Sequence, residues 1–302
     1  MNVTIVGSGP AGISAALYLK RAGMQVTILA KDGGALLKAD HIENYYGFSE
    51  PISGKELHRR GVENAKRLGC VFREEEVFSI EYSNGFTVKT NRGVYQADAV
   101  ILATGAARKA PRIDGLSAFE GSGVSYCAVC DAFFYRKKDV AVLGSGEYAA
   151  HEAEILKQTS GSVTILTNGM PFTGTLPDEV MCDTRKIAAI VGEQTVSGIC
   201  FEDGTTLPIS GVFVAVGVAS STDLARKIGA LTEGTHIVVD ENGATNVPGL
   251  YAAGDCTGGL LQISTAVAEG AKAAMAIIRL LQKAPSTCLL YTSPSPRDST
   301  SC

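Results

Sequence analysis

Cys127 and Cys130 are separated by two residues and are followed directly by Asp131. A pair with this spacing is either half of a zinc site or a redox-active dithiol. Zinc needs four ligands, but the sequence has no second closely spaced cysteine pair, and its four histidines are scattered. Asp131 could donate the proton that a thiolate leaving group requires. The pattern therefore favours disulfide chemistry and predicts no bound metal.

A glycine-rich turn lies on each side of this dithiol. Each turn follows a short apolar segment and precedes an expected helix, which is the context of a dinucleotide-binding turn. The glycines permit a tight turn and close approach of a pyrophosphate, and the helix amino end carries partial positive charge. A dithiol between two such sites suggests electron transfer from a carrier through a flavin to a disulfide. The two turns are Gly7, Ser8, Gly9, Pro10, Ala11 and Gly12, and Gly144, Ser145, Gly146 and Glu147.

Composition excludes several classes of function. The net charge of −4 argues against nucleic acid as a partner, because no basic surface would neutralise phosphates. No apolar run is long enough to span a bilayer, so we expect no membrane segment. The amino-terminal residues lead directly into the first turn without the features of a signal peptide, so we expect a cytoplasmic protein. The eight cysteines should then be mostly reduced.

The order of expected elements is repeated along the chain. Val3–Val6, a helix over 13–22 and Val26–Leu29 form one βαβ unit, and the segments near 140–143, 150–158 and 163–166 form another. Asn84-Gly85 and Asp203-Gly204 mark a hairpin in each half. The uninterrupted apolar strands suit parallel sheets covered on both faces. The sequence therefore predicts the α/β class, with two Rossmann-like three-layer nucleotide-binding domains.

The expected domain boundaries follow from segments rich in proline and glycine. The first domain should be discontinuous and comprise residues 1–112 and 246–287, with the second domain, residues 113–245, inserted into it. Residues 288–302 have no periodicity and are rich in Ser, Thr and Pro, so we interpret them as a non-native tail and exclude them from the fold.

The motif order resembles that of the low-molecular-weight thioredoxin reductases, which are FAD-containing pyridine nucleotide-disulfide oxidoreductases. This order comprises the first glycine turn, Ala103-Thr104-Gly105, Cys-x-x-Cys-Asp, the second glycine turn and Gly254-Asp255. The placement of Cys-x-x-Cys-Asp inside the second domain is the specific part. The resemblance implies reduction of a thioredoxin-like protein, a homodimer, and rotation of the second domain between the two half-reactions.

The resemblance also implies roles for individual residues. Cys130 would face the flavin, Cys127 would attack the substrate disulfide, and Asp131 would be the general acid. FAD would be bound by the first glycine turn and, beyond it, by Asn44, Thr104, Gly105, Gly254, Asp255, Gln262 and Ile263. One expected element is missing, because the strand that normally ends in a ribose-binding acid ends here at Ala30-Lys31, with Asp32 slightly late.

The second glycine turn leaves the electron donor open. Members of the family that use NADPH carry a His-Arg-Arg cluster after the next strand, where this chain has Thr167-Asn168-Gly169. We therefore expect no tight selectivity for NADPH unless Arg185 or Lys186 reaches the site. The donor could be NAD(P)H or reduced ferredoxin, since the chain also resembles the ferredoxin-linked branch. An alternative function is a flavin-binding redox sensor or interaction module without efficient turnover.

Overall fold

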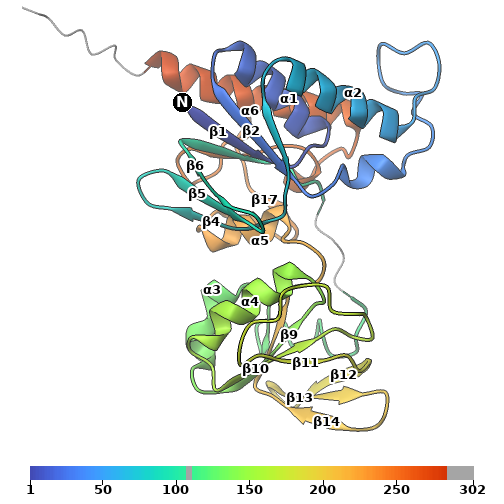
Figure 1. The fold of residues 1–302 in the computed structure, drawn as a ribbon, viewed down its shortest axis with the longest axis vertical. Helices are drawn as coiled ribbons and strands as arrows, with labels where there is room; N and C mark the ends of the chain where they lie inside the picture. Colours follow the sequence, from blue (N-terminus) through green and yellow to red (C-terminus); the bar gives the residue numbers. More distant parts are fainter. Residues whose placement is uncertain (107–110, 284–302) are drawn as a thin grey trace, which may run out of the picture.

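The computed structural model describes residues 1–106 and 111–283, which form two α/β units, each built on a parallel five-stranded sheet (Figure 1). The strand order is β18-β7-β1-β2-β3 in the first unit and β11-β10-β9-β15-β8 in the second. The predicted α/β class with two Rossmann-like units is confirmed. The tail predicted for residues 288–302 lies outside the described residues.

The first unit has three layers. Helices cover one face of the parallel sheet, and a small antiparallel sheet covers the other. The parallel strands are β1 (Asn2–Val6), β2 (Gln25–Ala30), β3 (Val71–Glu74), β7 (Ala99–Leu102) and β18 (Leu250–Ala252). The helices are α1 (Pro10–Arg21), α2 (Gly54–Arg67) and α6 (Ile263–Lys283), and the antiparallel strands are β4 (Val77–Tyr82), β5 (Phe86–Thr90) and β6 (Val94–Ala97).

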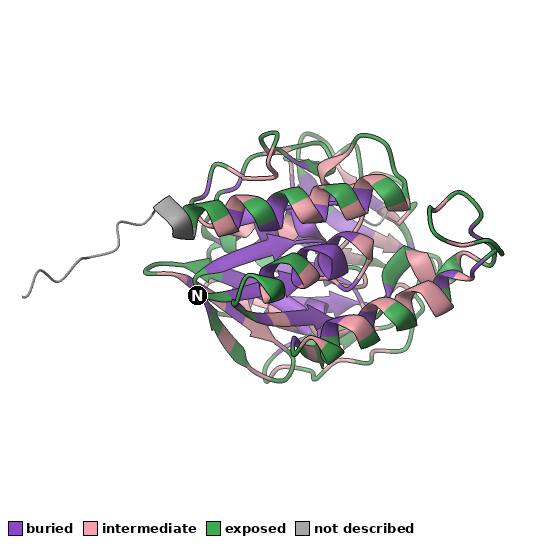
Figure 2. Cartoon of the chain, turned by 90° about the horizontal axis from the view of Figure 1, so that it is seen from above, coloured by how far each residue is buried: buried purple, intermediate pink, exposed green. Residues whose placement is uncertain are grey.

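Alternation along the parallel strands explains the two cores of this unit. Ile5 and Ile28 pack with Leu19 in the cluster on the helical side, whereas the next residues, Val6 and Leu29, belong to the cluster on the side of the small sheet. Successive side chains of a strand point to opposite faces, so a strand that is apolar throughout is buried on both. Figure 2 shows these buried strands lying beneath the helices.

The second unit repeats this plan with fewer helices. Its parallel strands are β8 (Val124–Ser125), β9 (Asp139–Leu143), β10 (Ser162–Leu166), β11 (Met181–Asp183) and β15 (Gly211–Val214). The helices are α3 (Ala128–Asp131) and α4 (Glu147–Lys157), with a 3₁₀ turn η2 (Ala132–Tyr135) after α3. The antiparallel sheet consists of β12 (Ile187–Gly192), β13 (Val196–Phe201) and β14 (Thr206–Pro208).

Both predicted hairpins form. Gly85 lies between β4 and β5 with a φ of 122°, and Gly204 lies between β13 and β14 with a φ of 82°. These positive φ values are accessible to glycine at little cost. The helix expected near the end of the described chain is α6, and no helix among residues 1–106 and 111–283 is both long and apolar enough to cross a bilayer.

Elements that precede the expected boundary at residue 246 also contact the first unit. Helix α5 (Ser221–Lys227) packs against β4, and β17 (His236–Ile237), which pairs with β16 (Thr232–Glu233), packs against the 3₁₀ turn η3 (Asp255–Thr257). A capping box between Ser220 and Asp223 starts α5 soon after the glycine that follows β15. The Pro- and Gly-rich segment 242–248 forms a turn before β18, stabilised by backbone N–H groups that donate to Asp240.

Candidate functional site

The first glycine turn has two glycines that the fold requires and one that it does not. Gly7 has a φ of 113°, and a methyl group there would lie 2.2 Å from the carbonyl oxygen of Ala103. A methyl group at Gly12 would lie 2.1 Å from the carbonyl oxygen of Gly7, whereas one at Gly9 would meet no atom of the described residues within 4 Å. Glycine at position 9 therefore leaves open space at the amino end of α1.

A cavity of about 580 Å³ follows the carboxyl edge of the first sheet. Its wall contains residues that follow β3, β2, β1, β7 and β18, in the spatial order of these strands, so the cavity crosses the whole sheet. Ligands of open α/β sheets bind at this edge. Of the residues predicted to bind FAD, the wall includes Gly7, Ser8, Gly9, Pro10, Ala11, Thr104, Gly105, Gly254, Asp255, Gln262 and Ile263.

Two of the predicted residues are not part of this wall. Gly12 packs behind it, against Gly7. Asn44 lies beside it, and its Nδ2 donates a hydrogen bond to Oε1 of Gln262 at 3.0 Å. The structure therefore joins the segment around Asn44 to the start of α6, although the two are 218 positions apart in the sequence.

Glu269 of α6 fixes the turn that contains Gly254 and Asp255. The N–H of Gly254 and the hydroxyl of Thr257 both donate to Oε2 of Glu269, at 2.7 and 3.1 Å. Gly254 has a φ of 83°. Glu269 is the one acidic residue of α6, and no motif in the sequence pointed to this role.

Two other residues that no sequence motif indicated, Ser221 and His58, contact residues of the cavity wall. Ser221, at the start of α5, accepts a hydrogen bond from the N–H of Thr104 at 3.3 Å, and the two hydroxyl oxygens are 2.5 Å apart. His58 of α2 lies with its Nε2 2.9 Å from the hydroxyl oxygen of Ser8. Burial lowers the pKa of His58, so the ring is neutral at pH 7 and holds Ser8 without adding charge.

Cys127 and Cys130 form a disulfide, with Cα atoms 5.3 Å apart. Helix α3 begins directly after Cys127, and the N–H of Cys130 donates to Sγ of Cys127 at 3.2 Å. The carboxylate of Asp131 accepts from the hydroxyl of Ser125 at 2.6 Å, and the same hydroxyl oxygen accepts from the N–H of Cys127. Ser125 therefore fixes the acid relative to the disulfide, a role that its spacing in the sequence did not reveal.

Glu152 of α4 links the disulfide segment to the first unit. Its Oε2 accepts from the N–H of Ala128 at 3.1 Å, and its Oε1 pairs with Nζ of Lys227 at 2.5 Å. Both charged side chains are 2% exposed. Because Lys227 belongs to α5, which packs on the first unit, this ion pair joins the two units next to the cysteines.

The disulfide does not contribute to the cavity. Cys127, Cys130 and Asp131 are all outside its wall. Cys127 is 6% exposed, whereas Cys130 is exposed. The structure thus brings together the predicted FAD residues from both ends of the chain, and it places the disulfide in a separate position.

The second glycine turn is covered by a segment of the chain itself. The N–H of Thr173 donates to the carbonyl oxygen of Ser145 at 2.8 Å, and both the N–H and the hydroxyl of Thr175 donate to Oε1 of Glu147 at 3.0 Å. Between them, Gly174 approaches so closely that an added methyl group would lie 2.9 Å from the backbone of Gly146. Backbone and side chain thus contact the amino end of α4, where a pyrophosphate would bind.

Arg185 and Lys186, the two cations considered as ligands of a 2′-phosphate, have different contacts. Arg185 forms ion pairs with Asp183 and Asp203, and its guanidinium lies 3.8 Å from the centre of the Phe201 ring. Its donors are therefore engaged within the protein. The stem of Lys186 lies against Gly169, just beyond β10, and its side chain is exposed. A single lysine thus stands where a cluster of cations would bind a phosphate.

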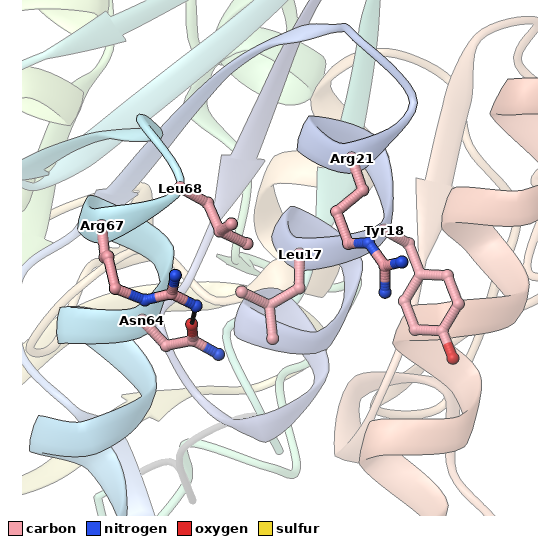
Figure 3. Close-up of a pocket in the computed structure, with 6 residues that line it drawn as sticks. All are labelled: Leu17, Tyr18, Arg21, Asn64, Arg67 and Leu68. Carbon is pink, nitrogen blue, oxygen red and sulfur yellow. Dashed lines mark hydrogen bonds between the residues drawn. The ribbon is translucent and has the colours of Figure 1, made fainter.

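A second cavity, of about 350 Å³, lies between α1 and α2 (Figure 3). Its wall includes Arg21 and Arg67, the last residues of these helices, and Arg67 donates to Oδ1 of Asn64 at 2.8 Å. In a βαβ unit the helix carboxyl ends lie at the opposite sheet edge from the glycine turn. None of the six residues in its wall has a thiol or a carboxyl group, so we assign it no redox chemistry.

Comparison with known proteins agrees with this geometry. The sequence pattern described as Pyridine nucleotide-disulphide oxidoreductase matches residues 1–270. A thioredoxin reductase of Aquifex aeolicus is 36% identical over 304 aligned positions, which cover 93% of each chain.

Among solved structures, the atypical thioredoxin reductase TRi of Desulfovibrio vulgaris Hildenborough is 41% identical, with a TM-score of 0.89 over 94% of this chain and 99% of that one. A ferredoxin-flavin thioredoxin reductase of Clostridium acetobutylicum is 31% identical, with a TM-score of 0.70 over 93% of this chain and 98% of that one. The chain therefore belongs to the pyridine nucleotide-disulphide oxidoreductases and, within them, to the low-molecular-weight thioredoxin reductase family.

Proposed function

We propose that this protein is an FAD-dependent disulfide oxidoreductase that reduces thioredoxin or a thioredoxin-like protein through Cys127 and Cys130. The observation that carries this proposal is the Cys127–Cys130 disulfide in a chain whose first unit has a cavity suited to a dinucleotide. The names of the relatives, all thioredoxin reductases, support the choice of substrate.

The residues of the first unit fit FAD. The open space at Gly9 would admit a pyrophosphate next to the amino end of α1, and the cavity continues from there in both directions along the sheet edge. Thr104, Asp255 and Gln262 would contact the flavin half, since they line the part formed by β7, β18 and α6. Bound FAD would supply the electron pair that reduces the disulfide.

The cysteines would then carry out thiol–disulfide exchange. The N–H of Cys130 donates to Sγ of Cys127, which favours negative charge on that sulfur and supports Cys127 as the attacking thiolate. Its attack on the substrate disulfide forms a mixed disulfide and releases one substrate thiolate, which takes a proton from Asp131. Cys130 would then give its thiol proton to Asp131 and attack Sγ of Cys127. This attack restores the Cys127–Cys130 bond and releases the second substrate sulfur as a thiolate, which takes that proton.

Both half-reactions require the second unit to move. Neither cysteine lines the cavity, and Cys127, the proposed attacking residue, is buried. Movement of the second unit relative to the first would bring Cys130 to the flavin in one position and expose Cys127 in another. The connection near Gly217, which lies between β15 and α5, would act as a hinge.

We further propose that the electron donor is a reduced iron–sulfur protein of the ferredoxin type. The covered turn at Gly144–Glu147 and the engaged Arg185 both disfavour a pyridine nucleotide in the second unit. The Clostridium relative, which is named as ferredoxin-linked, supports this choice of donor. A carrier of single electrons would reduce the flavin in two successive transfers.

Anaerobic reduction of the purified flavoprotein tests the donor. We expect reduced ferredoxin to bleach the flavin absorption band rapidly, and NADPH and NADH to bleach it slowly or not at all. Rapid bleaching by NADPH would contradict the donor assignment and leave the disulfide chemistry in place. If FAD is bound but no donor reduces the disulfide, the alternative function, a flavin-binding redox sensor without efficient turnover, would be favoured.

Trapping tests the disulfide chemistry separately. The C130S variant should retain FAD, lose substrate turnover and accumulate a mixed disulfide between Cys127 and a thioredoxin, detectable by mass spectrometry. The C127S variant should accumulate much less mixed disulfide, which could form only through Cys130. Preferential trapping on Cys130 would show that the two cysteines have the opposite roles.

A further inference from the structure

The strand that should supply a ribose-binding acid supplies a lysine instead. In dinucleotide-binding units, an acid near the end of the second strand holds the ribose of the adenosine half. Here β2 ends at Ala30 and Lys31 follows it. The neighbouring strand β3 runs parallel to β2, with Glu74 in register with Ala30, and is followed by Glu75 and Glu76. The acids are therefore displaced by one strand along the same sheet edge.

Glu76 has one carboxylate oxygen engaged and one free. Its Oε2 pairs with Nζ of Lys31 at 2.7 Å. Its backbone is fixed on both sides by Asn91, which accepts from the N–H of Glu76 at 3.0 Å through its side chain and donates its own N–H to the Glu76 carbonyl at 3.1 Å. The side chain is 6% exposed, and its Oε1 is buried without a hydrogen-bond partner among residues 1–106 and 111–283.

The neighbouring acid shows that this free oxygen is specific to Glu76. Glu75 also lines the cavity and is also buried, but the hydroxyl of Tyr95 donates to its Oε1 at 2.7 Å and that of Thr90 donates to its Oε2 at 2.6 Å. Buried polar atoms are nearly always satisfied, because an unpaired one costs free energy. Because Glu76 lines the cofactor cavity, its unpaired Oε1 points to a donor on the ligand.

We propose that Glu76 replaces the missing acid of β2 and that its Oε1 accepts a hydrogen bond from the adenosine half of FAD. This inference rests on the proposed use of FAD. With the pyrophosphate at the turn after β1, one half of the dinucleotide lies over the ends of β2 and β3, and this is the adenosine half. The donor is the ribose 2′-hydroxyl or the adenine 6-amino group. Lys31 is the positioning residue that holds the carboxylate.

Asp32 is the rival candidate, because it also lies in the wall of the cavity. It differs from Glu76 in both burial and engagement. Asp32 is exposed, and its Oδ1 accepts from the N–H of Gly34 at 2.8 Å, which closes a local turn. A solvent-exposed oxygen needs no ligand to be satisfied, so the structure favours Glu76.

Cofactor titration of the full-length apoprotein tests the proposal without measuring activity. FAD, its 2′-deoxyadenosine analogue and its inosine analogue are titrated into the wild type, E76A, E76Q, E75Q and D32N, with flavin fluorescence as the signal. We expect E76A to bind FAD about 10- to 100-fold more weakly than the wild type, the effect of losing one charged hydrogen bond. E76Q, which has one acceptor oxygen instead of two, should lose less FAD affinity than E76A. If E76A fails to fold, E76Q should still show the difference between FAD and the analogue that lacks the donor.

The analogues identify the donor. The analogue that lacks the donor should bind the wild type about as weakly as FAD binds E76A. The affinity of that analogue should be the same for E76A as for the wild type. E75Q and D32N should preserve the ratio between FAD and each analogue. Unchanged FAD affinity in both Glu76 variants, or a loss that is equal for FAD and both analogues, would overturn the proposal. A wild type that takes up no FAD would instead contradict the proposed function.

Discussion

Lys227 and Glu152 form an ion pair across the two units, with an Nζ–Oε1 distance of 2.5 Å and each side chain 2% exposed. The second oxygen of Glu152 accepts from the peptide N–H that follows Cys127. The contact between the units and the conformation of the disulfide segment therefore depend on the same carboxylate. Any separation of the units would leave this carboxylate without its cation.

Replacing Lys227 by methionine should strongly destabilise the protein, because it leaves a buried carboxylate unpaired. We expect a loss of about 3–5 kcal/mol in the free energy of unfolding, measured by urea denaturation. The K227M/E152L double variant should recover much of that loss, because it removes both charges. The exposed pair of Lys89 and Glu81 provides the control, and K89M should cost at most about 1 kcal/mol. Equal effects of K227M and K89M would contradict the importance of burial.

Gly9 and Gly7 should respond differently to alanine. G9A places its methyl group in open space, so the apoprotein should keep its thermal stability, but FAD should bind at least about 10-fold more weakly because the methyl group occupies the approach of the pyrophosphate. G7A forces a methyl group against the Ala103 carbonyl at a positive φ, so it should reduce stability whether or not FAD is present. Melting temperatures with and without FAD separate the two effects. Normal FAD affinity in G9A would argue against a pyrophosphate at this turn.

Asp131 should be needed for proton transfer and not for cofactor binding. We expect D131N to slow thioredoxin reduction by about 100-fold or more, while the flavin spectrum stays unchanged. S125A removes the hydroxyl that fixes Asp131, so it should slow the same step to a smaller extent. Rapid-mixing measurement of the dithiol–disulfide exchange step isolates this effect from flavin reduction. A full rate in D131N would assign the proton donor to another group or to water.

Burial should protect Cys256 from alkylation. Its thiol is buried, which raises its pKa to about 12, and it donates to the carbonyl oxygen of Leu102. After mild reduction at pH 8, iodoacetamide should label the exposed Cys130 while Cys256 stays unmodified until the protein is denatured. Peptide mapping by mass spectrometry measures the labelling at each position. Rapid labelling of Cys256 in the folded protein would show that its surroundings open readily.

The sequence was sufficient to predict the layers of the fold, because these depend on local patterns. Apolar strands such as Val3–Val6 and Val140–Leu143, each followed by a glycine turn, specify parallel βαβ units, and Gly85 and Gly204 mark the hairpins. The boundary expected at residue 246 stays a prediction, because Pro and Gly in segment 242–248 mark a turn as readily as a linker.

Much of the site depends on contacts that no local pattern reveals. Ser221 meets Thr104 across 117 positions, and Glu76 meets Lys31 across 45. The covering of the second glycine turn depends on Gly174, which lies in an irregular segment with no motif. Glycine spacing predicts where a turn can accept a phosphate, but it does not predict whether another part of the chain already occupies that place.

His151 should make the stability of the protein depend on pH. Its ring stacks on Phe78 with centroids 5.4 Å apart, and burial, followed by the charges of Lys227 and Lys89, lowers its pKa to about 4. The unfolded chain takes up a proton near pH 6.5 that the folded protein does not bind until about pH 4. The free energy of unfolding should therefore fall as the pH decreases between these two values.

H151F removes this proton uptake and keeps an aromatic ring against Phe78, so its stability relative to the wild type should increase from pH 7 to pH 5. Urea denaturation at both pH values measures the change, with H41F at an exposed position as the control. A difference between H151F and the wild type that is the same at both pH values would mean that His151 binds its proton equally well in the folded and unfolded states.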